Sequence, residues 1–132
     1  MLPAPRIEAA LFEVGAGETY SLEGVQALLD GLTAINRAWL RHHKAPQLYA
    51  SGVRYKRERG KEAWQAIPAV LRAGSGDCED LASWRAAELQ DRGERARAVL
   101  VKVRPRQLHV MVRRQNGRLE DPSRRLGMKG PA

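Results

Sequence analysis

The sequence predicts an α+β fold, with helices first and a small antiparallel sheet after them. Upstream of Gly93, apolar residues recur at the 3.6-residue period of an amphipathic helix. After Gly93 the period changes to two, and Asn116-Gly117 is typical of the turn in a β-hairpin. The length of 132 residues suits a single domain, and runs of strands after runs of helices favour the α+β class.

The first predicted helix runs from Leu22 to about Arg41. Residues 7–14 precede it as a short strand or an irregular lead-in, residues 15–17 break that segment, and Ser21 is a suitable N-cap. Within the helix the apolar side chains form one wide stripe, which we expect to face the core: Val25, Leu28, Leu29, Leu32, Ile35, Trp39 and Leu40.

A loop and a second helical segment follow. Residues 45–60 predict a loop with a short extended piece around Val53 and Tyr55. Residues 62–71 predict a helix interrupted at Pro68, which fits the first turn of a further short helix over 68–73. The Gly-Ser-Gly run at 74–76 predicts a hinge-like loop.

The strongest helix prediction covers Cys78 to about Asp91. Asp77 and Asp80 form a short variant of the capping box at its start, and Gly93 is placed to end it. Three strands are then predicted, over 96–103, 108–113 and 119–121, with a turn at Pro105 and a stop at Pro122. We expect them to form an antiparallel meander.

The chain is basic, and its charge is concentrated near the C-terminus. It has 23 Lys and Arg against 15 Asp and Glu, a formal charge of +8, and residues 102–132 hold nine basic residues and two acidic ones. This end therefore suits an acidic partner. No aromatic residues interleave with the arginines and no zinc-finger or RNP-type motif is present, so we do not expect a nucleic-acid partner.

Composition also bears on the cellular compartment. A single cysteine excludes an internal disulfide and a zinc site built on several cysteines. No apolar run approaches the roughly 18 residues of a membrane span. The N-terminal residues lack a basic segment followed by an apolar one, so we expect no secretion signal, no membrane association and a cytoplasmic location.

The cysteine lies in the segment Gly-Ser-Gly-Asp-Cys-Glu-Asp, at the first turn of the predicted helix. Helix N-terminal N–H groups and the positive end of the helix dipole favour a thiolate, so Cys78 is suited to be a nucleophile. The alternative is a buried cysteine that serves as a small hydrophobic residue.

Two residues on the predicted strands supply partners for Cys78. His109 would take the thiol proton and later protonate the leaving amine. Asp121, on the next strand, would fix the imidazole tautomer and stabilise its charged form. Side chains alternate along a strand, so both residues share a face only if the hairpin loop is Gln115-Asn116-Gly117, which pairs 111 with 121. We therefore predict a bulged three-residue hairpin with Gly117 in the left-handed conformation.

These stretches resemble the transglutaminase-like cysteine peptidase superfamily. The short length of the chain and its segments L-Y-A-S-G-V-R-Y and D-P-S-R-R-L-G-M resemble small stand-alone members found in phage and prophage genomes. The similar segments are E-A-W-Q-A-I-P-A-V-L-R-A-G-S-G-D-C-E-D-L-A, L-H-V-M-V and N-G-R-L-E-D-P-S-R, within residues 62–125. The resemblance implies a papain-like catalytic core over 62–125, preceded by a helical part and loop over 1–61 and followed by a tail over 126–132. It assigns the family's nucleophile to Cys78, its histidine to His109 and its aspartate to Asp121. The host cytoplasm or a virion is the location implied.

Further site residues are less sharply indicated. The Cys78 backbone N–H is the natural first oxyanion donor, and Trp64, Gln65 or Gln47 would be the second. Asp77, Glu79 and Asp80 flank the thiol and oppose its ionisation, so they must be neutralised, with Arg124 and Arg125 as candidate partners. Helix caps and surface ion pairs are the interpretation we favour for the three carboxylates. A Ca²⁺ ion, as in a periplasmic branch of the family, is the alternative, and we otherwise expect no cofactor.

Three functions are compatible with the sequence. The first is an enzyme that transfers acyl groups from amide bonds of a protein or peptide through a thioester. It would be a peptidase or amidase if water resolves the thioester, and a cross-linking enzyme if a lysine amine does. The second is an inactive family fold used as a phage structural or assembly protein with an acidic partner. The third, a basic nucleic-acid-binding domain, would show steep salt dependence of binding.

Overall fold

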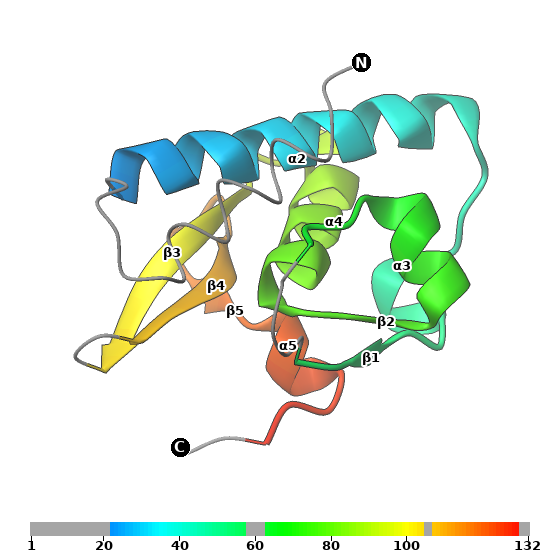
Figure 1. Ribbon diagram of the computed structural model, residues 1–132. Helices are drawn as coiled ribbons and strands as arrows, with labels where there is room; N and C mark the ends of the chain where they lie inside the picture. Colours follow the sequence, from blue (N-terminus) through cyan, green and yellow to red (C-terminus); the bar gives the residue numbers. More distant parts are fainter. Residues whose placement is uncertain (1–21, 58–62, 105–106, 130–132) are drawn as a thin grey trace.

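The computed structural model describes residues 22–57, 63–104 and 107–129. The chain is α+β, as predicted, with a long helix above, a hairpin at one side and a short helix below (Figure 1). The elements in chain order are α2 (Leu22–His42), η1 (Leu48–Ala50), β1 (Arg54–Tyr55), α3 (Ile67–Ala73), β2 (Ser75–Gly76), α4 (Cys78–Asp91), β3 (Arg97–Arg104), β4 (Gln107–Arg113), β5 (Leu119–Glu120) and α5 (Pro122–Arg125).

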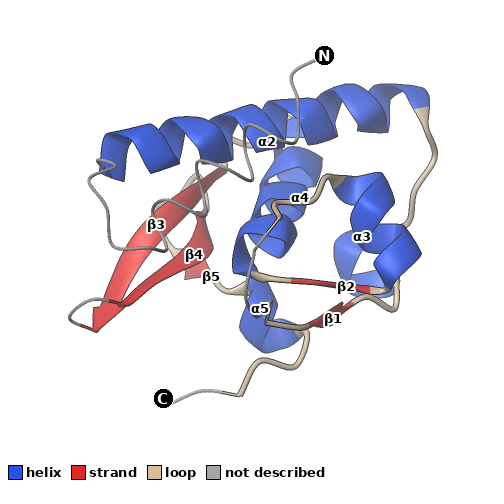
Figure 2. Cartoon of the chain, in the orientation of Figure 1, coloured by secondary structure: helices blue, strands red, loops and turns tan. Residues whose placement is uncertain are grey.

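Helix α4 is the centre of the molecule, with α2, the hairpin and α3 arranged around it (Figure 2). Every residue from Glu79 to Leu89 is buried, including charged ones such as Arg85 and Glu88. The helix therefore has no solvent face over most of its length, and its sequence shows only a weak apolar periodicity. The helix carries small side chains at Ala82, Ala86 and Ala87, so neighbouring elements can pack close to its backbone.

Two small sheets flank this helix. β3, β4 and β5 form the predicted antiparallel meander, in that order. β1 and β2 form a parallel pair, with Tyr55 opposite Gly76. The prediction of a hinge-like loop over 74–76 was therefore wrong at residues 75 and 76. A two-residue parallel strand leaves no periodic signal, because its partner is distant in the sequence.

The hairpin between β4 and β5 has the predicted three-residue loop. The Arg114 N–H donates to the Arg118 carbonyl at 2.8 Å, and the Gly117 N–H donates to the Arg114 carbonyl at 2.8 Å. Gly117 has φ +88°, the left-handed conformation that this loop requires. Val112 pairs with Glu120, which sets Asp121 diagonal to His109 on one face.

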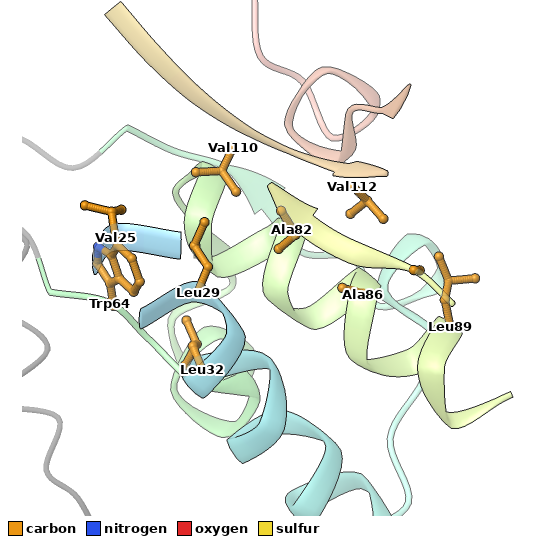
Figure 3. Packing of buried hydrophobic residues seen from close by; sticks show 11 residues of the cluster. Val25, Leu29, Leu32, Trp64, Ala82, Ala86, Leu89, Val110 and Val112 are labelled. Atoms are coloured by element: carbon orange, nitrogen blue, oxygen red, sulfur yellow. The ribbon is translucent and has the colours of Figure 1, made fainter. Parts of the chain in front are cut away.

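The core consists of two clusters on either side of α4. The first joins α2, α4 and the hairpin and includes Leu29, Ala82 and Val110 (Figure 3). Cys78 packs against this cluster. The second joins η1, β1, α3 and α4 and is built around the fully buried Trp84. The predicted apolar stripe of the first helix faces this core, since Val25, Leu29 and Leu32 are all buried.

Other sequence predictions met different outcomes. Residues 63–66 are not helical, and Ala66 has an extended backbone. Pro68 stands in the first turn of α3 as expected, but the backbone N–H groups before it bind side chains instead of helix carbonyls. The Gln65 N–H donates to Asp80 and the Ile67 N–H donates to Asn36. The short helices η1 and α5 were not predicted. Predictions for residues 7–17 and Ser21 lie outside the described residues. Among the described helices, none has both the length and the hydropathy needed to cross a membrane.

Candidate active site

Cys78 is the first residue of α4 and is half-buried. The predicted capping box is present: the Asp77 side chain caps the helix, and the Asp77 N–H donates to Asp80 Oδ2 at 3.0 Å. Gly76 avoids crowding in this turn, because a Cβ there would lie 3.1 Å from the Asp80 Cβ. The Gly-Asp-Cys-Glu-Asp segment thus holds the thiol at a fixed helix terminus.

The surroundings of the thiol favour its protonated form. Its Sγ donates to Glu79 Oε1 at 3.5 Å. Loss of solvation raises the pKa of Cys78 well above its ordinary value, and the charges of Glu79 and Asp77 raise it further, while the Val110 N–H opposes them. Burial and the two carboxylates together oppose ionisation of the thiol, so Cys78 would need a base to remove its proton before it could act as a nucleophile.

His109 and Asp121 meet as predicted. His109 Nε2 lies 3.0 Å from both Asp121 carboxylate oxygens, and the two side chains are 11% and 15% exposed. Burial alone would raise the pKa of Asp121, but the hydrogen bond and charge of His109 outweigh it and lower this pKa below its ordinary value. Since Nε2 faces the carboxylate, Nδ1 is the ring nitrogen left for proton transfer.

The thiol lies beside the strand that carries His109. β5 pairs with β4 only at Val112 and Arg113, so Val110 lies beyond the end of that pairing, and its backbone N–H acts to lower the pKa of Cys78. Val110 directly follows His109 and packs in the same cluster as Cys78. Within the described residues, the hydrogen bond from the thiol goes to Glu79 and none joins it to His109.

The candidate oxyanion donors differ in their positions. The expectation that Gln47 could be the second oxyanion donor was wrong. Its amide oxygen accepts a hydrogen bond from Arg92 at the C-terminal end of α4, and about 20 Å of helix separates that end from Cys78. Gln65 is half-buried, and its backbone N–H is bound by Asp80. Trp64 is 4% exposed in the cluster that Cys78 joins, and its indole N–H has no hydrogen-bond partner among the described residues. Trp64 is therefore the best placed of the three.

The Cys78 N–H, the expected first oxyanion donor, donates to Asp77 Oδ1 at 2.7 Å. An incoming carbonyl oxygen would have to displace this carboxylate oxygen. The first donor is thus present, but a local bond of the capping turn occupies it.

The acidic residues around the thiol do different things. Asp77, Cys78 and Glu79 each offer one potential ligand atom, and these atoms lie within 4.8 Å of one another. Asp80 lies outside this group, since its two oxygens bind the backbone N–H groups of Gln65 at 2.7 Å and Asp77 at 3.0 Å. The structure therefore gives Asp80 a structural role, in place of the expected role as a metal ligand.

Arg124 and Arg125, the cations expected to neutralise these carboxylates, have contacts of their own. The Arg125 guanidinium lies 4.0 Å over the Tyr49 ring. The Arg124 backbone N–H donates to Asp121 Oδ1 at 3.3 Å, so Asp121 also caps α5.

Tyr55 is a neighbour of the site that the sequence did not single out. It lies on β1, opposite Gly76 and close to the start of α4. Burial, followed by the charges of Asp77, Cys78 and Glu79, raises the pKa of Tyr55 to about 12. The pairing of β1 with β2 brings this phenol near Cys78.

No family model, curated protein or solved structure matches this chain. The candidate active site is therefore inferred from the geometry of this chain. That geometry consists of a cysteine at a helix N-terminus, a histidine on the adjoining strand, and an aspartate bound to that histidine.

Proposed function

We propose that this protein is a cysteine-dependent acyl-transfer enzyme that acts on amide bonds through a thioester, with a papain-like core of the transglutaminase type. The observation that carries the proposal is the largely buried His109–Asp121 pair, with His109 on β4, against which the Cys78 helix packs, and Asp121 directly after β5. A hydrogen-bonded pair of this kind orients an imidazole toward a nucleophile.

The reaction would begin with transfer of the Cys78 proton to His109 Nδ1 as the sulfur attacks the carbonyl carbon of the amide. A carbon–sulfur bond forms, the carbonyl electron pair moves to oxygen, and Asp121 stabilises the imidazolium. His109 then returns its proton to the amide nitrogen, the carbon–nitrogen bond breaks, and an amine leaves. The product on the enzyme is a thioester.

The second half of the reaction decides what kind of enzyme this is. His109 would remove a proton from water or from an amine, whose oxygen or nitrogen attacks the thioester and releases Cys78. Water gives a peptidase or amidase, and a lysine amine gives a cross-link. We favour hydrolysis because water is abundant.

Two features bear on what the site would accept. The Trp64 N–H, buried beside the cluster that Cys78 joins, is suited to bind the carbonyl oxygen in the transition state. Exposed basic residues of the C-terminal part favour an acidic protein or peptide partner: Arg113, Arg118, Arg124, Arg125 and Lys129.

Alkylation of Cys78 by iodoacetamide, measured against pH, tests the proposal. The chain has one cysteine, so mass spectrometry reports on this thiol alone. We expect reactivity at neutral pH that falls strongly in His109→Ala and is unchanged in the control His43→Ala, whose ring stacks on Trp39. Identical pH profiles for wild type and His109→Ala would exclude the enzyme.

An inactive fold with a structural or assembly role is the second candidate. The hydrogen bond between Cys78 and Glu79 and the raised pKa of this thiol favour it, because both keep the sulfur protonated. It predicts that Cys78→Ala leaves function intact and that alkylation occurs only at alkaline pH.

A further inference from the structure

A buried cluster of charged side chains lies directly beside the candidate triad. Glu120, the residue before Asp121, accepts hydrogen bonds through one oxygen from Arg85 Nε at 2.7 Å and through the other from Arg114 Nη1 at 2.8 Å. The Tyr49 hydroxyl also donates to it. Arg85 and Glu120 each have side chains only 10% exposed.

Arg85 is itself held on both sides. Its Nη1 donates to Glu88 at 2.7 Å on the same helix, and its guanidinium lies 4.8 Å from the centre of the Tyr49 ring. Glu88 in turn accepts from the Leu48 N–H at 3.0 Å. The ion pair is therefore fixed from η1, from α4 and from β5 at once.

This ion pair joins the two elements that carry the candidate catalytic groups. Arg85 lies two turns after Cys78 on α4, and Glu120 is the last residue of β5, directly before Asp121. Side chains alternate along a strand, so a Glu120 held against α4 turns Asp121 to the opposite face, where His109 lies.

We propose that Glu120 is a positioning residue, whose ion pair with Arg85 fixes the strand end that carries Asp121 relative to the helix that begins at Cys78. Burying these charges is costly, and apolar residues of similar volume often stabilise a protein as well or better. The ion pair instead fixes the orientation of the Glu120 side chain, because one carboxylate oxygen is bound by Arg85 and the other by Arg114. This inference rests on the proposed function for its catalytic meaning, but its geometric part is measurable alone.

The test compares Glu120→Gln with wild type in two measurements on the full chain. The first is the tautomer of His109 from ¹⁵N NMR of the histidines, assigned with a His109→Gln variant. Wild type is expected to be mainly the Nε2–H form, and Glu120→Gln a mixture of the two tautomers. The second is alkylation of Cys78 at neutral pH, expected to be slowed about 10- to 100-fold.

The matched control is Glu94→Gln. Glu94 binds the same Arg114 at 2.5 and 2.7 Å but makes no hydrogen bond to Arg85. We expect this control to keep both the His109 tautomer and the alkylation profile of wild type. If it changes them as much as Glu120→Gln does, the charge cluster acts only through general stability and the proposal is overturned.

A second variant covers the case in which Glu120→Gln does not fold. The double variant Arg85→Met with Glu120→Leu replaces the pair by apolar side chains of similar size. We expect it to fold and to lose the ordered His109 tautomer, whereas retention of that tautomer overturns the proposal. If wild-type alkylation does not depend on His109, the proposed function fails. If it does, and Glu120→Gln leaves it unchanged, only the positioning role fails.

Discussion

Asp80 provides the sharpest test of how the site is built. Its side chain is fully buried, and its two oxygens accept the Gln65 N–H at 2.7 Å and the Asp77 N–H at 3.0 Å. In Asp80→Ala both backbone donors lose their acceptor. A buried donor left unsatisfied costs about 1–3 kcal/mol, so the two together predict a loss of about 2–6 kcal/mol in the free energy of unfolding. That is a large fraction of the roughly 5–15 kcal/mol available to a domain.

Asp80→Asn separates the hydrogen bonds from the charge. Its amide oxygen can still accept one of the two N–H groups, so we expect about half the loss seen in Asp80→Ala. Urea unfolding at neutral pH, followed by the fluorescence of the buried Trp64 and Trp84, measures both variants. Asp91→Asn is the control, because Asp91 is exposed at the other end of α4, and we expect it to leave the urea midpoint unchanged.

Two results would refute this reasoning. One is an Asp80→Ala protein whose unfolding free energy falls by less than about 1 kcal/mol, since the two backbone donors would then not depend on this carboxylate. The other is a wild-type protein stabilised by CaCl₂ over EGTA when Asp80→Asn is not, which would assign Asp80 to a cation instead of to the capping turn.

Three further predictions follow from the site. Gly117→Ala places a Cβ on a residue with φ +88°, so it should lower the free energy of unfolding in urea by about 1–2 kcal/mol and slow the alkylation of Cys78. Unchanged values would mean that the loop does not set the register of Asp121. The lowered pKa of Asp121 means that its ion pair stabilises the fold above the ordinary aspartate pKa and that this stability is lost as the pH falls through the folded pKa. Asp121→Asn should therefore flatten the acid side of the plot of urea midpoint against pH, and an unchanged slope would contradict the shift. Trp64→Phe keeps a buried ring but removes the indole N–H. Acylation of Cys78 by p-nitrophenyl acetate should therefore slow about 100-fold or more, while alkylation by iodoacetamide stays constant. Equal effects on both rates would indicate a packing role alone.

The elements with local signals were predictable. The helix from Cys78 to Asp91 and its capping box were predicted because an N-cap, a first-turn acid and a terminal glycine all lie within the segment itself. The register of Asp121 was predictable for the same reason, since the length of one hairpin loop determines which face is taken by the residue directly after the paired strand.

Contacts between distant segments were not predictable in this way. The parallel pairing of β1 with β2 places Tyr55 beside Cys78, yet neither two-residue strand has a period to detect. The carboxylate of Asp80 binds the backbone N–H of Gln65, in a non-helical stretch whose composition favours a helix. Gln47 was misjudged because a long-range bond to Arg92 places it at the wrong end of α4.

The sequence by itself determined the kinds of groups in the site and the order in which local structure presents them: a cysteine at a helix start, a histidine on a strand and an aspartate past a three-residue turn. Only the tertiary structure decided the electrostatic state of the thiol. The helix terminus favours ionisation of Cys78. The packing of α4 at the centre of the molecule removes solvent from the thiol, and Glu79 accepts a hydrogen bond from its sulfur, so the pKa of Cys78 is raised. Desolvation depends on every element that surrounds a group, so it cannot be obtained from the residues next to that group in the chain.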